Sequence, residues 1–201
     1  MKRRARSRAR SGDAGRVRII AGRDRGRVLR FHAVDGLRPT GDRVRETLFN
    51  WLQPRLPGAR CLDMFAGSGA LGFEAASRGA AKVDMYERSC IALDDLSRNL
   101  QLLGAGAVDL HAEDVLQMRR VGAPYDIVFI DPPFDAQLHD AAIALLDRQQ
   151  LLNGGALVYL EWPAKAAPPA TPAHWRCRRD KVAGDVGFAL FDAGSVNIAS
   201  Q

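Results

Sequence analysis

The tetrapeptide Asp131-Pro132-Pro133-Phe134 is the segment of this sequence whose residue types point most directly to chemistry. It follows the run YDIVFI, which has the composition of a buried strand. Two consecutive prolines fix an extended backbone, so the segment is predicted to present Asp131 beyond the strand. A carboxylate there can accept an N–H bond from an exocyclic amine and make that nitrogen a better nucleophile. Since Phe134 offers a flat face on which a base can stack, the segment predicts methylation of an amine on a nucleobase.

A glycine-rich loop follows the first strand expected in the body of the chain. The run Gly67-Ser68-Gly69-Ala70-Leu71-Gly72 matches G-x-G-x-x-G. Many nucleotide sites share this pattern, because glycine lets the backbone approach a ligand and the following helix presents free N–H groups. Asp63 stands four residues before Gly67, where its carboxylate would repel a diphosphate. The loop therefore favours a positively charged ligand, and S-adenosylmethionine, with its sulfonium and amino groups, is such a ligand.

Two further acids end the next two predicted strands. Glu87 closes VDMYE, where it can accept both hydroxyls of a ribose. Asp114 closes AED, where its side chain and the backbone of Val115 can contact the edge of an adenine. Each acid also has a structural explanation, because Asp114 can cap a helix and Glu87 can be a solvated loop residue. Together with Asp63, the pattern predicts a cofactor cleft at the carboxyl ends of three strands.

The elements that position these motifs alternate between short apolar runs and longer helical stretches. Strands are expected at 59–65, 82–86, 108–111, 125–130 and 156–161, and helices at 70–77, 89–103 and 137–149. This alternation predicts an α/β fold with a doubly wound, Rossmann-like, mostly parallel sheet. After a Pro/Ala linker at 164–173, two runs around Gly184 predict an antiparallel C-terminal hairpin.

The segment before this body has a different pattern. VRIIAG and RVLRF predict a β-hairpin, and DRVRETLFNWLQ predicts an amphipathic helix that Asp42 caps and Pro54 ends. Its charge is also unusual. Residues 1–18 carry eight Lys and Arg against one Asp, a net charge of +7, and residues 19–45 carry seven Arg against three Asp, a net charge of +4. The net charge of the whole chain is +6, so the remaining residues sum to −5.

Clustered basic residues displace counterions from nucleic acid, so the N-terminal region is expected to meet a polyanion. A solvated tail that binds nothing specific is the alternative for residues 1–15. The arginines expected to contact RNA are Arg23, Arg25, Arg27, Arg43 and Arg45.

Cysteine and hydropathy patterns exclude several other classes. The three cysteines are far apart and form no C-x-x-C pair, which argues against a disulfide framework and a zinc site, and the four histidines have no metal-like spacing. No metal is therefore expected. The chain has 201 residues and no apolar run of about 18, so no membrane span is predicted. A cytoplasmic, monomeric protein is the expectation.

Five segments together carry a family resemblance: RIIAG, LRPTGDRVRETLFNWL, LDMFAGSGALGFEA, DIVFIDPPF and DKVAG. In these the chain closely resembles the RsmD family of bacterial 16S ribosomal RNA guanine-N2 methyltransferases, over roughly residues 16–192. The LRPT-x-DRVRE block is the most discriminating of the five. The chain departs from the family pattern at Gly41, where a Thr or Ser is usual, and in its more basic first fifteen residues.

The resemblance implies a class I methyltransferase that uses S-adenosylmethionine to make N2-methylguanine at guanine 966 of 16S RNA, in the small ribosomal subunit or its assembly intermediate. It implies that Arg38, Pro39 and Thr40 close over the cofactor. The cofactor-binding residues expected are Arg38, Thr40, Asp63, Phe65, Gly67, Ser68, Gly69, Glu87, Asp114 and Val115. The catalytic residues expected are Asp131, Pro132, Pro133 and Phe134.

The expected organisation is a disordered basic tail at 1–15, a hairpin-and-helix extension at 16–54 and a methyltransferase domain at 55–201. Three other functions share part of the pattern. DNA adenine-N6 and cytosine-N4 methyltransferases also carry DPPF, a nicotinamide oxidoreductase would share the glycine loop, and a non-catalytic assembly factor could keep a vestigial cofactor pocket. Methylation of guanine N2 requires an unpaired or flipped guanine, because the amine lies on the Watson–Crick side of the base.

Overall fold

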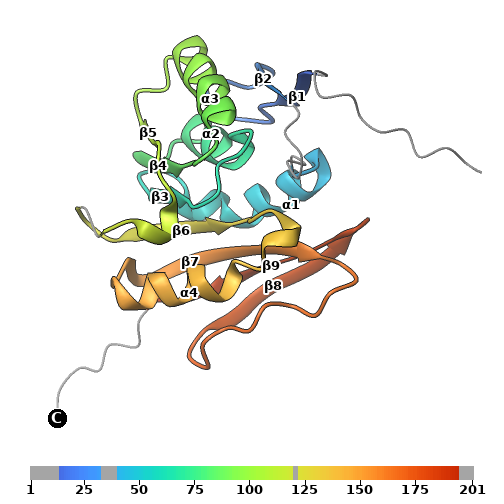
Figure 1. Cartoon of the computed structure of the whole chain (residues 1–201), viewed down its shortest axis with the longest axis vertical. Coiled ribbons are helices and arrows are strands. Elements are labelled where there is room, and N and C mark those ends of the chain that lie inside the picture. The colour runs from blue at the N-terminus through green and yellow to red at the C-terminus, as the bar shows by residue number, and fades with distance from the viewer. Residues whose placement is uncertain (1–13, 33–39, 120–121, 195–201) are drawn as a thin grey trace, which may run out of the picture.

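A computed structural model describes residues 14–32, 40–119 and 122–194 of the chain (Figure 1). The predicted basic tail lies outside these residues except for its last two positions, which begin the first strand. Arg38 and Pro39 lie outside them as well. In the part of the chain that is described, no helix is long and apolar enough to cross a membrane.

The elements follow one another in the alternating order that the sequence predicts. The strands are β1 (Ala14–Arg18), β2 (Val28–His32), β3 (Arg60–Asp63), β4 (Lys82–Tyr86), β5 (Val108–His111), β6 (Tyr125–Ile130), β7 (Leu152–Pro163), β8 (Arg176–Ala183) and β9 (Val186–Asp192). The α-helices are α1 (Asp42–Leu52), α2 (Ala70–Ser77), α3 (Cys90–Leu103) and α4 (His139–Arg148), and short 3-10 turns lie at Gln53–Arg55, Val115–Gln117 and Phe134–Ala136.

Seven strands form one sheet in the order β5-β4-β3-β6-β7-β9-β8. The first five are parallel, and β9 pairs antiparallel with both β7 and β8. The predicted Rossmann-like sheet with an antiparallel C-terminal hairpin is therefore confirmed. The sequence pattern did not show that β9 inserts between β7 and β8. That pairing also explains why β7 extends beyond the predicted 156–161, since β9 continues the ladder to Pro163.

Helices cover both faces of this sheet, and each face has its own core. The first core packs α1, α2 and α3 against one face of the sheet, and it includes Phe49 of α1, Phe73 of α2 and Phe129 of β6. The second joins α4 to the other face through Ile143, Leu146 and their neighbours. Burial of these apolar side chains, each contributing ~1.5 to 3 kcal/mol, holds the strand ends in a fixed relation to one another.

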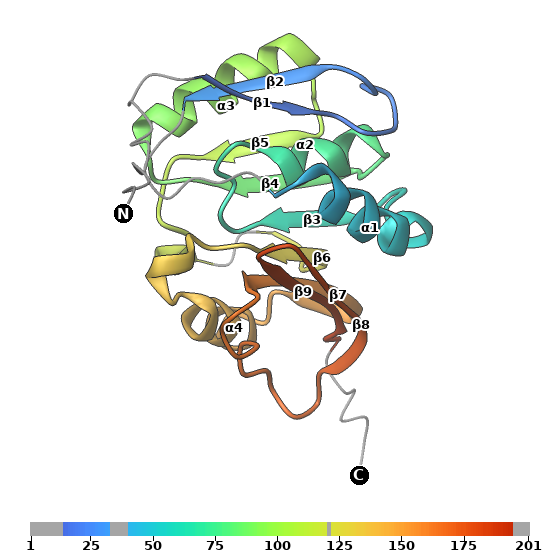
Figure 2. The same ribbon diagram turned by 90° about the vertical axis from the view of Figure 1, so that its right-hand side faces the viewer.

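The predicted N-terminal hairpin is present as a separate two-stranded sheet, β1 with β2 (Figure 2). Polar groups of α3 hold the free edge of β2: Asn99 Oδ1 accepts from the Arg30 N–H at 3.2 Å, and Asp95 Oδ2 accepts from the His32 N–H at 2.7 Å. The connection between the two strands lies against the end of α2, where Ser77 Oγ accepts from the Asp24 N–H. These bonds satisfy backbone groups that an isolated hairpin would leave to water.

Helix α1 differs in one detail from the prediction. Its N-cap is Gly41 rather than Asp42, and no side-chain hydrogen bond caps it. Asp42 instead lies in the first turn, where a carboxylate stabilises the positive end of the helix dipole.

We expect Gly41→Ser to stabilise the protein by about 0.3 to 1 kcal/mol, because serine caps helices well and restricts the unfolded chain. Gly41 has φ −59° and ψ 150°, which serine adopts without strain, and a Cβ there would meet no atom of the described residues within 4 Å. Urea denaturation followed by circular dichroism measures the change. A lower midpoint for the serine variant would contradict it.

Candidate active site

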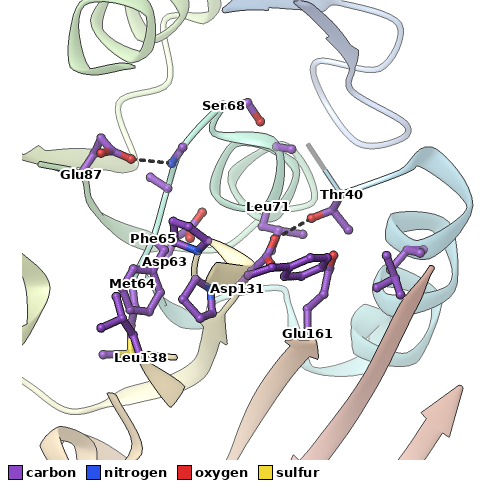
Figure 3. A pocket seen from close by; sticks show the side chains of 18 of the residues that line it. Thr40, Asp63, Met64, Phe65, Ser68, Leu71, Glu87, Asp131, Leu138 and Glu161 are labelled. Atoms are coloured by element: carbon purple, nitrogen blue, oxygen red, sulfur yellow. Dashed lines mark hydrogen bonds between the residues drawn. The ribbon is translucent and has the colours of Figure 1, made fainter. Parts of the chain in front are cut away.

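A cavity of about 620 Å³ lies at the carboxyl ends of β3, β4, β6 and β7 (Figure 3). Twelve of the predicted catalytic and cofactor-binding residues line it: Thr40, Asp63, Phe65, Gly67, Ser68, Glu87, Asp114, Val115, Asp131, Pro132, Pro133 and Phe134. Residues predicted from five separate segments of the sequence therefore meet at one place, as expected for the switch point of a doubly wound sheet.

The glycine loop joins β3 to α2 at the floor of this cavity. Asp63, the last residue of β3, is 2% exposed, and its Oδ2 accepts from the Gly72 N–H at 3.0 Å. Gly67 and Gly69 have φ of +51° and +79°, conformations that side chains other than glycine rarely adopt. Gly69 itself does not line the cavity. It is the N-cap of α2, and a Cβ there would lie 2.5 Å from the ring of Phe73, so its role is to form the turn.

Glu87 lies at the opposite side of the cavity from Thr40 and Glu161 (Figure 3). Its Oε2 accepts from the Gly67 N–H at 2.9 Å, and its Oε1 accepts from the N–H groups of Arg88 and Ser89. These bonds fix the orientation of the carboxylate. Asp114 caps the 3-10 turn that begins at Val115, with its Oδ1 accepting from the Leu116 N–H. Both the capping role and the position in the cavity are thus present for Asp114.

The DPPF segment leaves β6 and forms one wall of the cavity. Thr40 Oγ1 donates to Asp131 Oδ2 at 2.9 Å, which ties the start of α1 to this segment (Figure 3). Pro133 begins a short 3-10 turn with ψ 130°, so the backbone is extended where the prolines predicted it. Phe134 is 36% exposed and lines the cavity, so part of this residue is accessible to a ligand.

Burial raises the pKa of two carboxyl groups in the cavity, those of Asp63 and Asp131. The pKa of Asp63 is raised to about 7, first by desolvation and then by the negative charge of Asp131, although the N–H bonds from Gly72 and Phe65 lower it. Desolvation raises the pKa of Asp131 to about 6, against the stabilising bond from Thr40. Two carboxyl groups whose pKa values lie this close to 7 favour a cationic ligand in the cavity, because a nearby cation stabilises the charged form of both.

A cation bound beside Asp63 should therefore release a proton. We expect the affinity for S-adenosylmethionine to rise by up to about tenfold per pH unit below pH 7 and to level off above it, because the ligand lowers a raised pKa. Calorimetry at pH 6.5 in two buffers of different ionisation enthalpy measures the release directly. If the affinity did not change between pH 5.5 and 7.5, and the binding enthalpy did not depend on the buffer, the ligand would not contact this acid.

Several parts of the cavity wall were not among the predicted site residues, and two of them come from the C-terminal strands. Glu161 lies on β7 next to the DPPF segment, and residues Ala183–Val186, at the turn between β8 and β9, line the same cavity. Glu161 ends the predicted strand 156–161, so the rule that identified Asp63, Glu87 and Asp114 could have identified it. The turn belongs to the DKVAG segment, for which the sequence offered a resemblance but no role.

The arginines predicted to bind RNA are divided by the structure. Arg23 and Arg25 are exposed near the end of α2, and Arg27 donates from its Nη2 to the carbonyl of Leu102 at the end of α3. Both helices start at the cavity and run away from it, so these three arginines lie at the far end of the sheet (Figure 2). Arg43 is exposed and lines the mouth of the cavity.

The prediction for Arg45 is wrong, because this side chain is fully buried. Its Nη2 donates to the carbonyl of Arg18 and to Asp42 Oδ1, and its Nε donates to the carbonyl of Thr40. Its Nη1 lies 3.6 Å from Glu74 Oε2. Arg45 therefore joins α1 to the hairpin and to α2, and it cannot contact RNA.

Known proteins similar to this chain share both its sequence and its fold. The family model described as Conserved hypothetical protein 95 matches residues 17–192. Ribosomal RNA small subunit methyltransferase D of Escherichia coli K12 is 46% identical over 181 residues, covering 89% of this chain and 90% of that protein. The same enzyme from Haemophilus influenzae is 44% identical, covering 88% and 94%.

The solved structure of yhhF from Escherichia coli has a TM-score of 0.79 and 44% identity, and the match covers 90% of this chain and all of that one. The family match over residues 17–192 includes the glycine loop and the DPPF segment and contains every residue that lines the cavity. The chain belongs to the RsmD family of bacterial 16S ribosomal RNA methyltransferases.

Proposed function

We propose that this chain methylates the exocyclic N2 amine of a guanine in 16S ribosomal RNA of the small ribosomal subunit, at guanine 966, with S-adenosylmethionine as methyl donor. The observation that carries the proposal is that Asp131 and Phe134 line the same cavity as Asp63 and Glu87, the acids beside the glycine loop. Relatives named ribosomal RNA small subunit methyltransferase D, alike over about nine-tenths of the chain, support the choice of RNA over DNA.

The cavity residues fit S-adenosylmethionine. Asp63 would hold the amino group, because it is a buried acid whose charged form a cation stabilises. Glu87, with its carboxylate fixed by three backbone N–H groups, would hold the ribose hydroxyls, and Asp114 with Val115 would hold the adenine. When bound, this donor would supply a methyl group on a sulfonium sulfur, and the sulfur would keep the electron pair of the S–C bond that breaks when the guanine nitrogen attacks the methyl carbon.

Asp131 would accept one N–H of the guanine amine and orient the nitrogen lone pair toward the methyl group. An arylamine lone pair is delocalised into the ring, so the hydrogen bond that localises it favours attack. The proton leaves readily once the nitrogen has become cationic, and Asp131 can take it because its pKa is raised to about 6. Positioning of this kind can supply up to ~7 to 11 kcal/mol of the barrier reduction.

The RNA backbone would approach at the mouth of the cavity. Arg43 on α1 and Arg88 after β4 are exposed cations on two sides of the lining, and Phe134 lies between the sheet and solvent. Arginine binds phosphate through a planar fork, so these two side chains suit the phosphates that flank a flipped base. The arginines of the hairpin would contact RNA farther from the target.

A methyl-transfer assay with separate acceptors tests the proposal. The purified protein is incubated with tritiated S-adenosylmethionine and with small ribosomal subunits from a strain lacking the enzyme, free 16S RNA or duplex DNA, and each acceptor is digested to nucleosides. We expect label in N2-methylguanosine from the RNA acceptors. Label in methyladenine or methylcytosine of DNA, or no label in any acceptor, would contradict it.

A further inference from the structure

A buried carboxylate, that of Glu161, lies beside Asp131, and the proposed chemistry does not use it. Glu161 is 3% exposed and lines the same cavity. It comes from β7, the strand parallel to β6, and Ile130 lies in register with Leu160. Asp131 and Glu161 therefore follow paired residues of neighbouring strands, and Figure 3 shows both on the side of the cavity where Thr40 lies.

The position of Glu161 is fixed by neighbours on both sides. Its Oε2 accepts from the Tyr159 hydroxyl at 2.7 Å, and its backbone carbonyl accepts from His139 Nε2 at 2.7 Å. Burial raises the pKa of Tyr159, and the charges of Glu161 and Asp131 raise it further. The bond from Tyr159 offsets part of the cost of burying this carboxylate and orients it, and its place in the cavity wall allows it to accept from a bound polar ligand as well.

Guanine has the donor pattern that such an acid recognises. Its N1–H and one N–H of its N2 amine point the same way on the Watson–Crick edge, and a carboxylate can accept both at once. Adenine and cytosine present a ring nitrogen without hydrogen at that position, and a carboxylate would repel it. The second N–H of the amine then faces a different acceptor, which Asp131 supplies.

We propose that Glu161 is the residue that selects guanine, by accepting N1–H and one N2–H of the flipped base while Asp131 accepts the other N2–H. This assignment rests on the proposed function, since it takes a guanine amine as the methyl acceptor. It assigns separate tasks to the two acids: Glu161 recognises the base, and Asp131 activates the nitrogen.

The test compares guanine with 2,6-diaminopurine, which keeps the N2 amine but has an unprotonated N1. Small subunits are reconstituted with ligated 16S RNA that carries either base at the target position. We expect wild-type protein to prefer guanine by roughly 5- to 150-fold in kcat/KM, the discrimination of one bidentate pair. In Glu161→Gln the amide can donate to the unprotonated N1, so the preference should fall at least tenfold.

Glu46→Gln is the matched control, because Glu46 is exposed on α1 and lies outside the cavity. It should keep the wild-type preference. A merely structural role for Glu161 would lower both rates together and leave their ratio unchanged, which would overturn the assignment. The wild-type ratio needs no variant, so equal methylation of the two bases by wild-type protein would overturn it even if Glu161→Gln failed to fold. Absence of methylation on guanine itself would instead contradict the proposed function.

Discussion

Replacing Asp131 with asparagine should lower kcat for methyl transfer by about 10²- to 10⁴-fold, the range observed when a positioned proton-accepting or charge-stabilising group is removed. The amide can still accept the Thr40 hydroxyl, so the wall of the cavity keeps its shape. The asparagine variant lacks the negative charge that orients the amine and accepts its proton. Single-turnover kinetics with small ribosomal subunits measures the change without interference from product release.

Two further readouts separate lost chemistry from lost structure in this variant. S-adenosylmethionine should still bind, and the pKa of Asp63 should fall, because the charge of Asp131 raises it in the native protein. Asp109→Asn removes a carboxylate that pairs with Lys82 at the surface and should leave the rate unchanged. A variant with an unaltered rate would show that Asp131 does not contact the reacting nitrogen.

Replacing Arg45 with methionine should destabilise the protein by about 3 to 5 kcal/mol, because it leaves the buried Glu74 without one of its cations. Glu74 is fully buried and accepts from the N–H groups of Ile20 and Ala21 as well as from Arg78 Nε. Arg45 also holds the carbonyl of Arg18. The loss should therefore loosen the hairpin together with α1. With m near 2 kcal/mol/M, the urea midpoint should fall by roughly 1.5 to 2.5 M.

Arg43→Met is the matched control on the same helix. Arg43 is exposed, so its replacement should change the free energy of unfolding by no more than about 0.5 kcal/mol while weakening binding of RNA. The two variants remove the same charge two residues apart, which makes burial the difference between them. Equal urea midpoints for the two variants would be incompatible with the buried network around Glu74.

Much of the fold and the site could be predicted because local patterns carry the information. The apolar runs and helical stretches identified the parallel strands, and acids at strand ends identified Asp63, Glu87 and Asp114. In a parallel sheet, carboxyl ends meet at one edge, so residues far apart in sequence converge without any long-range information. The prolines of the DPPF segment fixed its backbone in the same local way.

Other features depend on contacts that no local pattern records. Arg43 and Arg45 are both arginines on one amphipathic helix, and only the packing of the hairpin and α2 over α1 buries the second. The insertion of β9 between β7 and β8 places the turn at Gly184 over the cavity, and this pairing is long-range. The far position of Arg23, Arg25 and Arg27 follows from where the hairpin packs, which the charge pattern does not show.

The location of the methyl group in the product tests most directly whether the cavity acids act on one guanine. Small subunits from a strain lacking the enzyme are methylated to completion, and the 16S RNA is cut with a ribonuclease and analysed by mass spectrometry. We expect one methyl group per RNA, on N2 of a single guanine, at guanine 966. A methyl group on a ribose, on adenine or spread over several guanines would contradict the assignment of the cavity acids to one flipped guanine.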